Sequence, residues 1–385
     1  MLRILLFSPK GAGTHYFGPG MSAYNMYRRL DPKVARVSLV HGYPDQEESD
    51  LFEHQYYISD LTSNGPRSMA DFLWNAKKWI RKHAGQFDVV HCLTAFHTSF
   101  LFALWCEKVG VPAFIKIAES KHTGFTESST VSNLLGLKKF RIRNANRITG
   151  YISISSAIRE KLIEAGIDEH RIVDIPNGVD TERFHPAGIE EKRQARNDLG
   201  LKDTFTVIFT GAFNKRKNPF LVLQAFADLP DCSDYQLLLI GPDRDDGEER
   251  AKISGFINEK KLSHVHVLPF VHDIETCYRA SDLFVLPSRE EGLSNSLLEA
   301  QSCGLPAIVT PVSGAEDLIE EGVNGSFIDY TSEHITRAMN RFIRDRELHT
   351  RASSMARNQI LEQYDSRIIL KKHMEMFQGS ISGKS

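Results

Sequence analysis

The stretch LPSREEGLSNSLLEAQSCGLPAIVT, residues 286–310, is the most informative local pattern of this chain. It starts at the end of an apolar run, passes through a Gly-Leu-Ser-Asn turn, and continues into a helical segment that leads to a second apolar run, PAIVT. Gly292 permits a tight backbone path, and Ser294 or Asn295 can cap the helix. A strand, a turn, a helix and a strand in this order predict part of a parallel sheet covered by helices.

Two carboxylates flank this turn: Glu291 lies on the loop, and Glu299 lies about one turn inside the helix. The N–H groups at the start of the helix, together with the helix dipole, favour a phosphate, and carboxylates accept hydrogen bonds from hydroxyls. A phosphate between two groups that bind hydroxyls suits a nucleotide-sugar. The alternative is an ordinary capped helix with two solvated glutamates, and the pair alone does not separate these interpretations.

Short apolar runs alternate with helical patterns along the whole chain. The runs expected to form strands are 3–8, 35–42, 87–93, 112–118 and 150–155 in the first half, and 204–211, 235–241, 265–270, 283–287 and 306–310 in the second. This alternation is typical of α/β proteins with parallel sheets, and 385 residues are too many for one typical core. We therefore expect an α/β fold with two Rossmann-like domains.

The composition is that of a soluble globular protein, with 41% hydrophobic and 25% charged residues and no apolar run close to membrane-spanning length. The N-terminus has a short apolar run, 4–7, before Pro9 and Lys10, so it predicts a first strand instead of a signal peptide, and a cytoplasmic location. The five cysteines are widely spaced without a Cys-x-x-Cys pair, which argues against a zinc site. We expect no metal and no cofactor.

The net charge of −2 hides a strong asymmetry along the chain. Residues 67–147 hold 13 Lys and Arg against 5 Asp and Glu, whereas residues 151–385 hold 28 against 37. The basic residues concentrate in two segments, 77–82 and 134–143, where they alternate with apolar ones. Such segments usually form a solvated helix face. The sharper alternative is binding to an anionic membrane surface, on its inner face. No recognised nucleic-acid motif accompanies the charge, so we expect no nucleic-acid partner.

Several segments stand in an order that resembles the retaining glycosyltransferases of family 4. They are IPNGVDTERFHP (175–186), TGAFNKRKNPFLVLQAF (210–226), LLIGPD (238–243), HVLPFVHDIETCYRASDLFVLPS (266–288), EGLSNSLLEAQSCGLPAIVTPVSG (291–314) and EEGVNGSFI (320–328). The resemblance covers nearly the whole chain. It implies the GT-B fold, in which two Rossmann-like domains face each other across a cleft.

The resemblance also implies a division of the chain. We expect an acceptor-binding N-terminal domain over residues 1–185 and a nucleotide-sugar-binding domain over residues 186–362. Residues 363–385 are expected to hold a C-terminal helix that packs back on the N-terminal domain.

The resemblance assigns roles to individual residues of the second domain. Glu291 would meet hydroxyls of the transferred sugar, and Glu299 those of the ribose. The backbone of Gly292, Leu293 and Ser294 would hold the distal phosphate. These roles agree with the chemistry of the residues, because a carboxylate can accept two hydrogen bonds from a vicinal diol.

Two further regions are implied to bind substrate. The backbone of Phe270 and Val271 would line the base pocket. In the first domain, Gly18 and Gly20 of the glycine-rich turn 11–22 would let the backbone approach the diphosphate and the acceptor. Glycine-rich turns after a first strand are common in Rossmann-like domains, so a purely structural role is the alternative.

Cations must offset the charge of the leaving diphosphate, and here the chain departs from the family pattern. Members usually have Gly-Arg before a lysine, but this chain reads Gly-Ala with Ala212 in the place of the arginine, while Lys217 remains in register. Arg216 can substitute if the loop turns its guanidinium inward, since its planar fork matches two phosphate oxygens. Lys215 is expected to be a solvated loop residue.

No catalytic histidine is assigned. Many relatives carry a histidine at the end of the strand in PAFIKIA, where this chain has Ala118 or Glu119, with His122 nearby but shifted. His91 and His97 follow the third strand of the first domain. His91 is a candidate contact to acceptor or donor, with a core histidine bonded to the backbone as the alternative.

The resemblance implies transfer of a hexosyl group from a UDP- or GDP-linked sugar to an acceptor hydroxyl, with retention and without a metal. Glu291, Lys217 and Arg216 are the residues expected to act at the reacting centre. The acceptor is expected to be a glycan or a lipid-linked molecule, in the synthesis of a cell-surface polysaccharide or glycolipid. The alternatives are a GT-B enzyme of other chemistry, such as a sugar-nucleotide epimerase or a phosphorylase, and a nucleotide-sugar binding protein without turnover.

Overall fold

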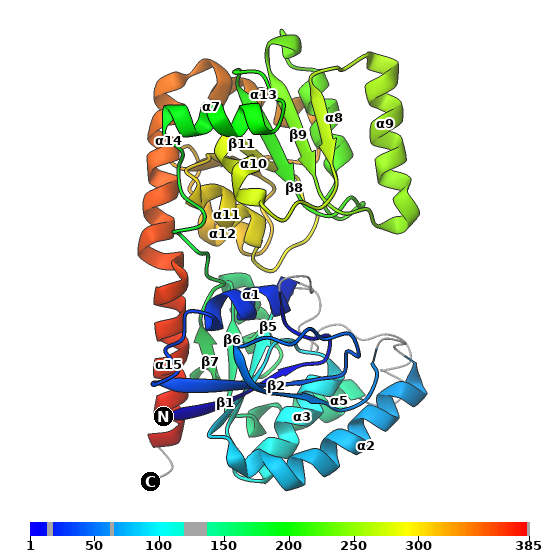
Figure 1. Cartoon of the computed structure of the whole chain (residues 1–385), viewed down its shortest axis with the longest axis vertical. Helices are drawn as coiled ribbons and strands as arrows, with labels where there is room; N and C mark the ends of the chain where they lie inside the picture. Colours follow the sequence, from blue (N-terminus) through cyan, green and yellow to red (C-terminus); the bar gives the residue numbers. More distant parts are fainter. Residues whose placement is uncertain (14–17, 62–64, 119–136, 383–385) are drawn as a thin grey trace. The chain divides into compact units, whose positions relative to one another are not determined.

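The computed structural model describes residues 1–13, 18–61, 65–118 and 137–382. The chain divides into two compact units, which we call unit 1 (Met1–Gly178 with Ser366–Ser385) and unit 2 (Val179–Asp365). The boundaries therefore follow residues 178 and 365, against the 185 and 362 expected from the sequence. Within the described residues each unit holds one parallel sheet, so the fold class is α/β, as the sequence predicts (Figure 1).

The described part of unit 1 forms a seven-stranded sheet with the strand order β3-β2-β1-β4-β5-β6-β7. The strands are β1 (Leu2–Ser8), β2 (Ala35–His41), β3 (Phe52–Tyr57), β4 (Val89–Cys92), β5 (Ala113–Ile117), β6 (Gly150–Ser153) and β7 (Ile172–Asp174). Five of them lie in the predicted runs, whereas β3 and β7 were not predicted. Strand β3 reads FEHQYY and lies at the edge of the sheet, and β7 has three residues. Neither shows the continuous apolar run of a buried parallel strand.

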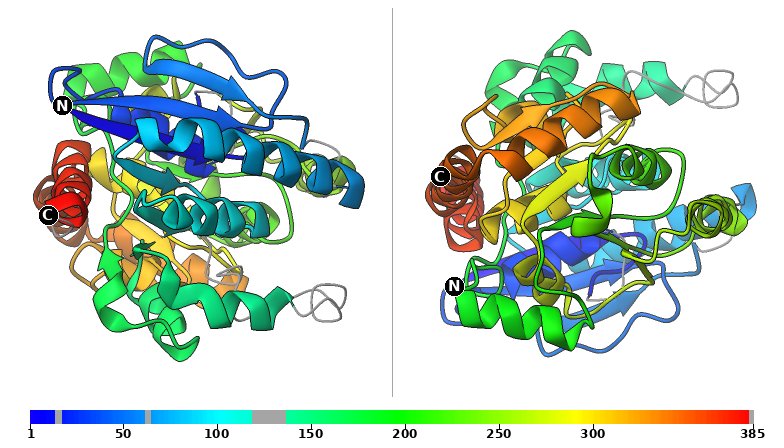
Figure 2. Two further views of the ribbon diagram at one scale, coloured as in Figure 1. Left: turned by 90° about the horizontal axis from the view of Figure 1, so that it is seen from below. Right: turned by 90° about the horizontal axis from the view of Figure 1, so that it is seen from above.

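Helices cover both faces of this sheet. They include α1 (Gly18–Tyr27), α2 (Pro66–His83), α3 (His97–Lys108), α5 (Leu137–Asn144), α6 (Ser156–Glu164) and α15 (Ser366–Ser382). Helices α2, α3 and α5 lie in a row, as the left view of Figure 2 shows, and Phe7 of β1 stacks on Phe102 of α3 at a ring-centroid distance of 4.0 Å. Because side chains alternate along a strand, Leu6 points to the opposite face.

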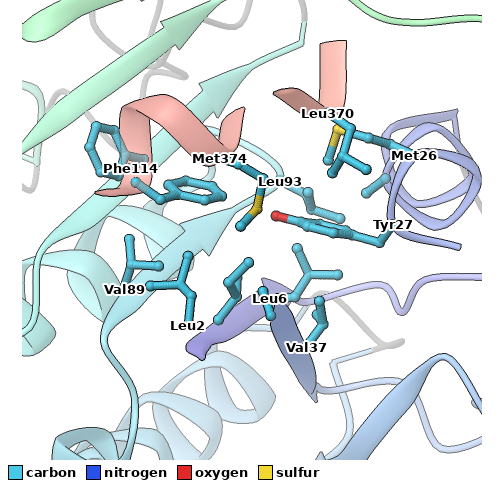
Figure 3. Close-up of a cluster of buried hydrophobic side chains, with 14 of the residues drawn as sticks. Leu2, Leu6, Met26, Tyr27, Val37, Val89, Leu93, Phe114, Leu370 and Met374 are labelled. Atoms are coloured by element: carbon cyan, nitrogen blue, oxygen red, sulfur yellow. The ribbon is translucent and has the colours of Figure 1, made fainter. Parts of the chain in front are cut away.

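The opposite face of the sheet packs against α1 and α15 (Figure 3). Leu6 and Val89 from the strands and Tyr27 from α1 form one buried cluster with Leu370 and Met374 of α15. Helix α15 is thus part of the core of unit 1, although the rest of that unit ends at Gly178. It is the C-terminal helix that the sequence predicts within residues 363–385.

The described part of unit 2 forms a six-stranded sheet with the strand order β10-β9-β8-β11-β12-β13. The strands are β8 (Thr206–Thr210), β9 (Gln236–Ile240), β10 (Val265–Leu268), β11 (Leu283–Leu286), β12 (Ala307–Val309) and β13 (Gly325–Phe327). Its helices include α7 (Ile189–Asp198), α8 (Pro219–Ala227), α9 (Glu248–Lys260), α10 (Ile274–Ala280), α11 (Asn295–Ser302), α12 (Ala315–Leu318), α13 (Ser332–Arg344) and α14 (Arg346–Gln359). All five predicted runs form strands here, and only the three-residue β13 is additional.

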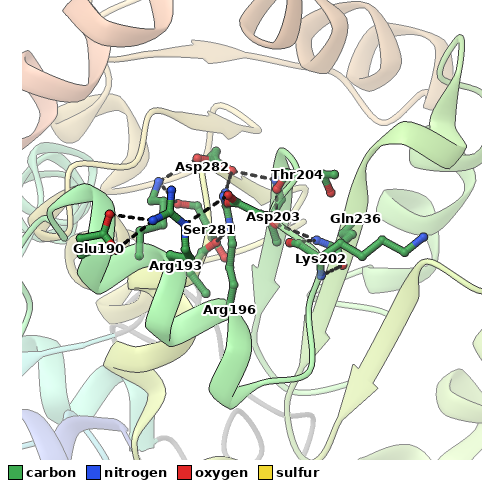
Figure 4. A network of polar contacts seen from close by, with 12 residues as sticks. Glu190, Arg193, Arg196, Lys202, Asp203, Thr204, Gln236, Ser281 and Asp282 are labelled. Carbon is green, nitrogen blue, oxygen red and sulfur yellow. Dashed lines mark hydrogen bonds and ion pairs between the residues drawn. The ribbon is translucent and has the colours of Figure 1, made fainter.

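Hydrogen bonds and ion pairs around Asp282 connect α7 to this sheet (Figure 4). The Asp282 carboxylate accepts hydrogen bonds from Lys192 Nζ at 2.7 Å, Arg196 Nη2 at 2.6 Å and the backbone N–H of Thr206 at 2.8 Å. The side chains of Asp282 and Arg196 are only 13% and 9% exposed. Asp203 binds the same guanidinium at 2.5 Å but is 57% exposed. Asp282 therefore neutralises two cations at the start of β8, and Asp203 lies at the solvated edge.

We predict that Asp282→Ala destabilises unit 2 by about 3 kcal/mol, because removal of one member of a buried ion pair leaves its partner charged and desolvated. The matched control Asp203→Ala should cost much less, because exposed ion pairs contribute little to stability. Thermal unfolding monitored by circular dichroism compares the two variants. Equal losses of stability would contradict the assignment of Asp282 as the central acceptor.

Candidate functional site

Strand order locates the candidate site at the carboxyl ends of the central strands of the unit 2 sheet. Strand β8 lies between β9 and β11, so the connections leave it in opposite directions. In parallel α/β sheets, ligands bind outside the carboxyl ends of the strands at such a switch point. The loop after β8, 211–218, and the loop after β11, 287–294, both begin there.

Close backbone contacts fix the paths of these two loops. A Cβ added to Gly241 would lie 1.9 Å from the carbonyl oxygen of Gly211, and one added to Gly314 would lie 2.3 Å from that of Gly292. Ser313 Oγ also donates a hydrogen bond to the Gly292 carbonyl at 3.1 Å. The Gly292 turn is therefore held by its neighbours, and any side chain at Gly241 or Gly314 would displace a loop of the site.

The two loops meet in an ion pair between Lys217 and Glu291. Lys217 Nζ lies 2.6 Å from Glu291 Oε1, and the two side chains are 11% and 10% exposed. Arg216 Nη1 lies 3.3 Å from the same carboxylate oxygen and donates to the carbonyl of Glu290 at 2.8 Å. The three residues that the sequence predicts for the reacting centre are thus brought together.

Electrostatics keep Glu291 ionised. Burial by itself would raise the pKa of Glu291, but the charges of Lys217 and then Arg216 outweigh it, so that the pKa lies below its ordinary value. Arg216 is half-exposed and turned toward Glu291, as it must be to replace the arginine absent at Ala212. Lys215 is 73% exposed and solvated, as expected, with its nearest carboxylate, Glu248, at 3.8 Å.

Glu299 has a different environment. It lies inside α11, and its Oε2 accepts a hydrogen bond from the Tyr278 hydroxyl at 3.1 Å. Burial raises the pKa of Glu299 to about 7, although Tyr278 and Arg183 act in the opposite direction. Arg183 is itself bonded to Glu275 at 2.7 Å. At neutral pH this carboxylate is therefore poised between its charged and neutral forms.

The start of α11 differs from the predicted cap. Ser294 occupies the N-cap position, but its side chain makes no capping hydrogen bond. Its Oγ lies 2.9 Å from Ser296 Oγ instead, and Asn295 is the first helical residue. The prediction is wrong for Ser294, because its hydroxyl has a side-chain partner, and Asn295 lies inside the helix instead of at the cap position. An anion at this helix start would meet the backbone of Gly292, Leu293 and Ser294.

The predicted base-pocket residues lie on the loop between β10 and α10. Phe270 is 48% exposed, and its ring makes an edge contact with His272 at 5.1 Å. Val271 is half-buried. Arg183 donates a hydrogen bond to the carbonyl of His272 at 2.8 Å, which ties this loop to the surroundings of Glu299.

Two residues near Glu299, Tyr278 and Arg183, were not predicted. Both lie in segments that carry the family resemblance, 266–288 and 175–186, but nothing in the local pattern separates them from core or surface residues. Only the three-dimensional fold brings them beside the carboxylate.

In unit 1, the predicted glycines open helix α1. Gly18 is its first residue and Gly20 is buried in its first turn. Among the described residues, a Cβ at Gly18 would meet no atom within 4 Å, so packing does not explain this glycine. Part of the glycine-rich turn, 14–17, lies outside the described residues.

His91 is a core residue. It is fully buried in β4, its Nδ1 lies 2.8 Å from the Tyr27 hydroxyl, and its ring lies 5.4 Å from that of His373 in α15. Its predicted contact with a substrate is wrong for this structure, because the ring points into the sheet–helix core. The structure agrees better with the alternative, a buried core histidine, although the hydrogen-bond partner of His91 is the Tyr27 hydroxyl instead of the backbone.

Of the other two candidate histidines, the structure describes only His97. His97 is the first residue of α3, and its Nδ1 lies 3.1 Å from Arg141 Nη1. Burial and the Arg141 charge lower the pKa of His97. His122 and Glu119 lie outside the described residues. Within the part of the chain that the structure describes, no group of three or more His, Cys, Asp or Glu side chains is arranged to hold a metal.

The pKa of Glu299 predicts an effect on stability. A carboxyl with a folded pKa of about 7 and an unfolded pKa of 4.5 binds its proton more tightly in the folded state, so its contribution to stability falls as the pH rises from 4.5 to 7. Glu299→Gln has no carboxyl to ionise, so it avoids this loss of stability. Without ligand, its free energy of unfolding should exceed that of the wild type by up to about 2 kcal/mol at pH 8 but by little at pH 5. Melting temperatures at both pH values test this, with the exposed Glu333→Gln as control. A pH-independent difference would contradict it.

Two family models match this chain. Residues 191–359 match the family "Glycosyl transferases group 1", and residues 17–183 match "Glycosyltransferase Family 4". The UDP-Gal:alpha-D-GlcNAc-diphosphoundecaprenol alpha-1,3-galactosyltransferase of Escherichia coli is 29% identical over 288 residues, which cover 73% of this chain and 72% of that protein.

Solved structures share the fold. The Anabaena protein Alr3699/HepE, in complex with UDP and glucose, has a TM-score of 0.80 at 18% identity over 98% of this chain and all of that one. WaaG, a glycosyltransferase involved in lipopolysaccharide biosynthesis, has a TM-score of 0.75 at 16% identity over 98% of this chain and all of that one. The chain therefore has the GT-B fold and belongs to the glycosyltransferases that join a family 4 domain to a group 1 domain.

Proposed function

We propose that this glycosyltransferase transfers a hexosyl group from a nucleoside diphosphate sugar to an acceptor hydroxyl, with retention of the anomeric configuration. The observation that carries the proposal is the Lys217–Glu291 pair, held by two loops beside the start of α11 and close to a second carboxylate, Glu299. A UDP-linked donor is favoured, since the Escherichia coli relative is named for UDP-Gal and the Anabaena structure holds UDP and glucose. A GDP-linked donor is the alternative.

Different residues bind different parts of the donor. Glu299 accepts hydrogen bonds from the ribose hydroxyls, and Glu291 accepts them from the transferred sugar. The diphosphate lies at the start of α11, where backbone N–H groups and the helix dipole favour negative charge. Phe270 and Val271 border the base.

The reaction needs charge stabilisation more than a nucleophile. As the bond between the sugar C1 and the diphosphate oxygen breaks, negative charge grows on the diphosphate. Lys217, Arg216 and the helix start stabilise it. The acceptor oxygen bonds to C1 on the same face, and its proton passes to the departing diphosphate oxygen. Glu291 holds Lys217 in place before the donor binds, and the lysine charge in turn keeps the carboxylate ionised.

We predict that Lys217→Ala lowers kcat/KM for the donor by about 100-fold, the typical loss when one electrostatic stabiliser is removed. The matched control is Lys215→Ala, two residues away and 73% exposed, which should leave kcat/KM within about twofold. The assay incubates the protein with labelled UDP- and GDP-sugars and an acceptor extract and measures nucleotide release. Unchanged release in Lys217→Ala would show that the assignment is wrong.

The same assay separates the alternatives. Conversion of the donor sugar to an epimer without acceptor indicates a GT-B epimerase. Tight binding of UDP with no release in any acceptor extract indicates a nucleotide-sugar binding protein. Acceptor-dependent release supports the transferase.

The acceptor is proposed to be lipid-linked, in the synthesis of a cell-surface polysaccharide or glycolipid. The Escherichia coli relative is named for a diphosphoundecaprenol acceptor, and WaaG for lipopolysaccharide biosynthesis. No helix in the described residues is long and apolar enough to cross a bilayer. We therefore propose a cytoplasmic protein that binds the inner face of the membrane from outside the hydrocarbon core.

Two helices of unit 1 supply a basic and apolar surface for this contact. On α2, Trp74 is 64% exposed and Lys78 Nζ lies 5.0 Å from its ring. On α5, Phe140 and Ile142 are each 41% exposed beside Lys139. An indole or phenyl ring flanked by lysines suits the interface of an anionic membrane. The residues 134–136 of the second basic segment lie outside the described residues.

We predict that the protein floats with vesicles of anionic phosphatidylglycerol and not with vesicles of zwitterionic phosphatidylcholine. Exchanging Lys77 and Lys78 for Glu should reduce the bound fraction at least about fivefold, since each basic residue near the surface contributes about 1 kcal/mol. The control variant exchanges the exposed Lys371 and Lys372 of α15 and should bind like the wild type. Equal flotation with both vesicle types would remove the membrane proposal.

A further inference from the structure

The Tyr278 hydroxyl joins three elements of unit 2. Tyr278 lies on α10 and is fully buried, and its hydroxyl lies 2.7 Å from Thr210 Oγ1 at the end of β8. On α11 it lies 3.1 Å from Glu299 Oε2 and 3.3 Å from the carbonyl oxygen of Ser296. The phenol therefore connects the end of a central strand with the helix that carries the second carboxylate.

The donors and acceptors set the direction of this chain of hydrogen bonds. A tyrosine hydroxyl has one proton to donate, and an ionised carboxylate can only accept. Thr210 can donate its own proton to the Tyr278 oxygen, which leaves the phenolic proton for an acceptor on α11. Glu299 Oε2, at 3.1 Å and charged when ionised, is the nearer and stronger acceptor, and the neutral Ser296 carbonyl oxygen at 3.3 Å is the second. The main order is then Thr210 to Tyr278 to Glu299.

The same bond orients the carboxylate. One oxygen, Oε2, faces Tyr278, and within the described residues no hydrogen bond to Oε1 is found. A bond from a buried, rigid phenol fixes the rotation of the carboxylate more firmly than one from a flexible chain. The second oxygen is thereby left for a ligand hydroxyl.

We propose that Tyr278 is a positioning residue for the nucleotide: it acts through Glu299, holding that carboxylate turned toward the ribose hydroxyls. The inference rests on the proposed function, in which Glu299 binds the ribose. Tyr278 does not touch the donor itself. Its ring packs between Phe184 and Phe284, at centroid distances of 6.0 and 6.3 Å, so replacement by phenylalanine keeps the packing and removes only the hydroxyl.

Charge at Glu299 makes the role of Tyr278 depend on pH. The groups that act on this carboxylate are Tyr278, Arg183 and Lys217, which lower its pKa, and Glu275, which raises it together with burial. Without the tyrosine hydroxyl, the pKa of Glu299 rises above its value of about 7, so that less of the carboxylate is ionised near neutral pH. Nucleotide affinity in the variant should therefore recover only at higher pH.

The test measures the dissociation constants of UDP and of GDP by titration calorimetry for the wild type and Tyr278→Phe. We expect about tenfold weaker binding of the preferred nucleotide at pH 7.5, the loss typical of one hydrogen bond to a charged group. For that nucleotide, the ratio of the Tyr278→Phe dissociation constant to the wild-type dissociation constant should be smaller at pH 5.5, where Glu299 is protonated in both proteins. Titration of the nucleotide cancels in this ratio. A ratio that is the same at both pH values would indicate a structural defect and overturn the inference.

A matched control is Tyr364→Phe. Tyr364 is also a buried tyrosine of unit 2, with its hydroxyl 3.3 Å from the carbonyl oxygen of Asp317 and no contact to Glu299. This variant should bind UDP like the wild type. Thr210→Val, which removes the donor at the start of the chain, should weaken binding in the same direction as Tyr278→Phe but by less.

A double-mutant cycle separates failure of this inference from failure of the proposed function. If Tyr278 acts through Glu299, adding Tyr278→Phe to Glu299→Ala should change nucleotide affinity less than about twofold. If Glu299→Ala itself leaves affinity unchanged, the ribose role of Glu299 is wrong, and the proposed function loses its binding site. If Glu299→Ala weakens binding and Tyr278→Phe still has its full tenfold effect in that background, only the positioning role is wrong.

Discussion

The ion pair between Lys217 and Glu291 is the interaction on which the candidate site depends. It joins the loops that follow β8 and β11, the two strands on either side of the switch point of the unit 2 sheet. Both side chains are nearly buried, so each desolvated charge requires the other. The pair therefore connects the two loops and supplies charge at the site. It also holds Glu291, the residue at which the Gly292 turn begins.

The two carboxylates of the site have opposite electrostatic environments. Glu291 faces two cations and has a pKa below its ordinary value, whereas burial raises the pKa of Glu299 to about 7, and this carboxylate accepts its hydrogen bond from a tyrosine hydroxyl. The difference suits their positions. In the proposed function, the group next to the leaving diphosphate must stay ionised near neutral pH to keep a cation in place, and the group that binds a diol needs free lone pairs. Identical residue types in one motif thus acquire separate tasks from their neighbours.

Sequence patterns predict the fold class and the central residues of the site, and they fail where a residue's role depends on distant neighbours. The buried strands have continuous apolar runs, but β3, β7 and β13 are polar or short. Glu291, Glu299 and Lys217 lie in motifs with fixed spacing. His91 precedes a loop in the sequence, yet α15, nearly three hundred residues later, covers it. Tyr278 is a buried aromatic residue in its own helix, and only the neighbouring α11 gives its hydroxyl a partner.

The placement of these groups also explains why the family is evident while the substrates differ among its members. In the proposed function, Lys217 and the start of α11 bind the diphosphate and Glu299 binds the ribose, two groups that every nucleoside diphosphate sugar contains. Such contacts bind all donors of this class and discriminate little among them. On the same proposal, selection of the base falls to groups like Phe270, whose half-exposed ring can adapt to a pyrimidine or a purine, and selection of the acceptor to loops of unit 1. Substitutions at those positions would then change specificity without disturbing the charge arrangement that the proposed chemistry requires.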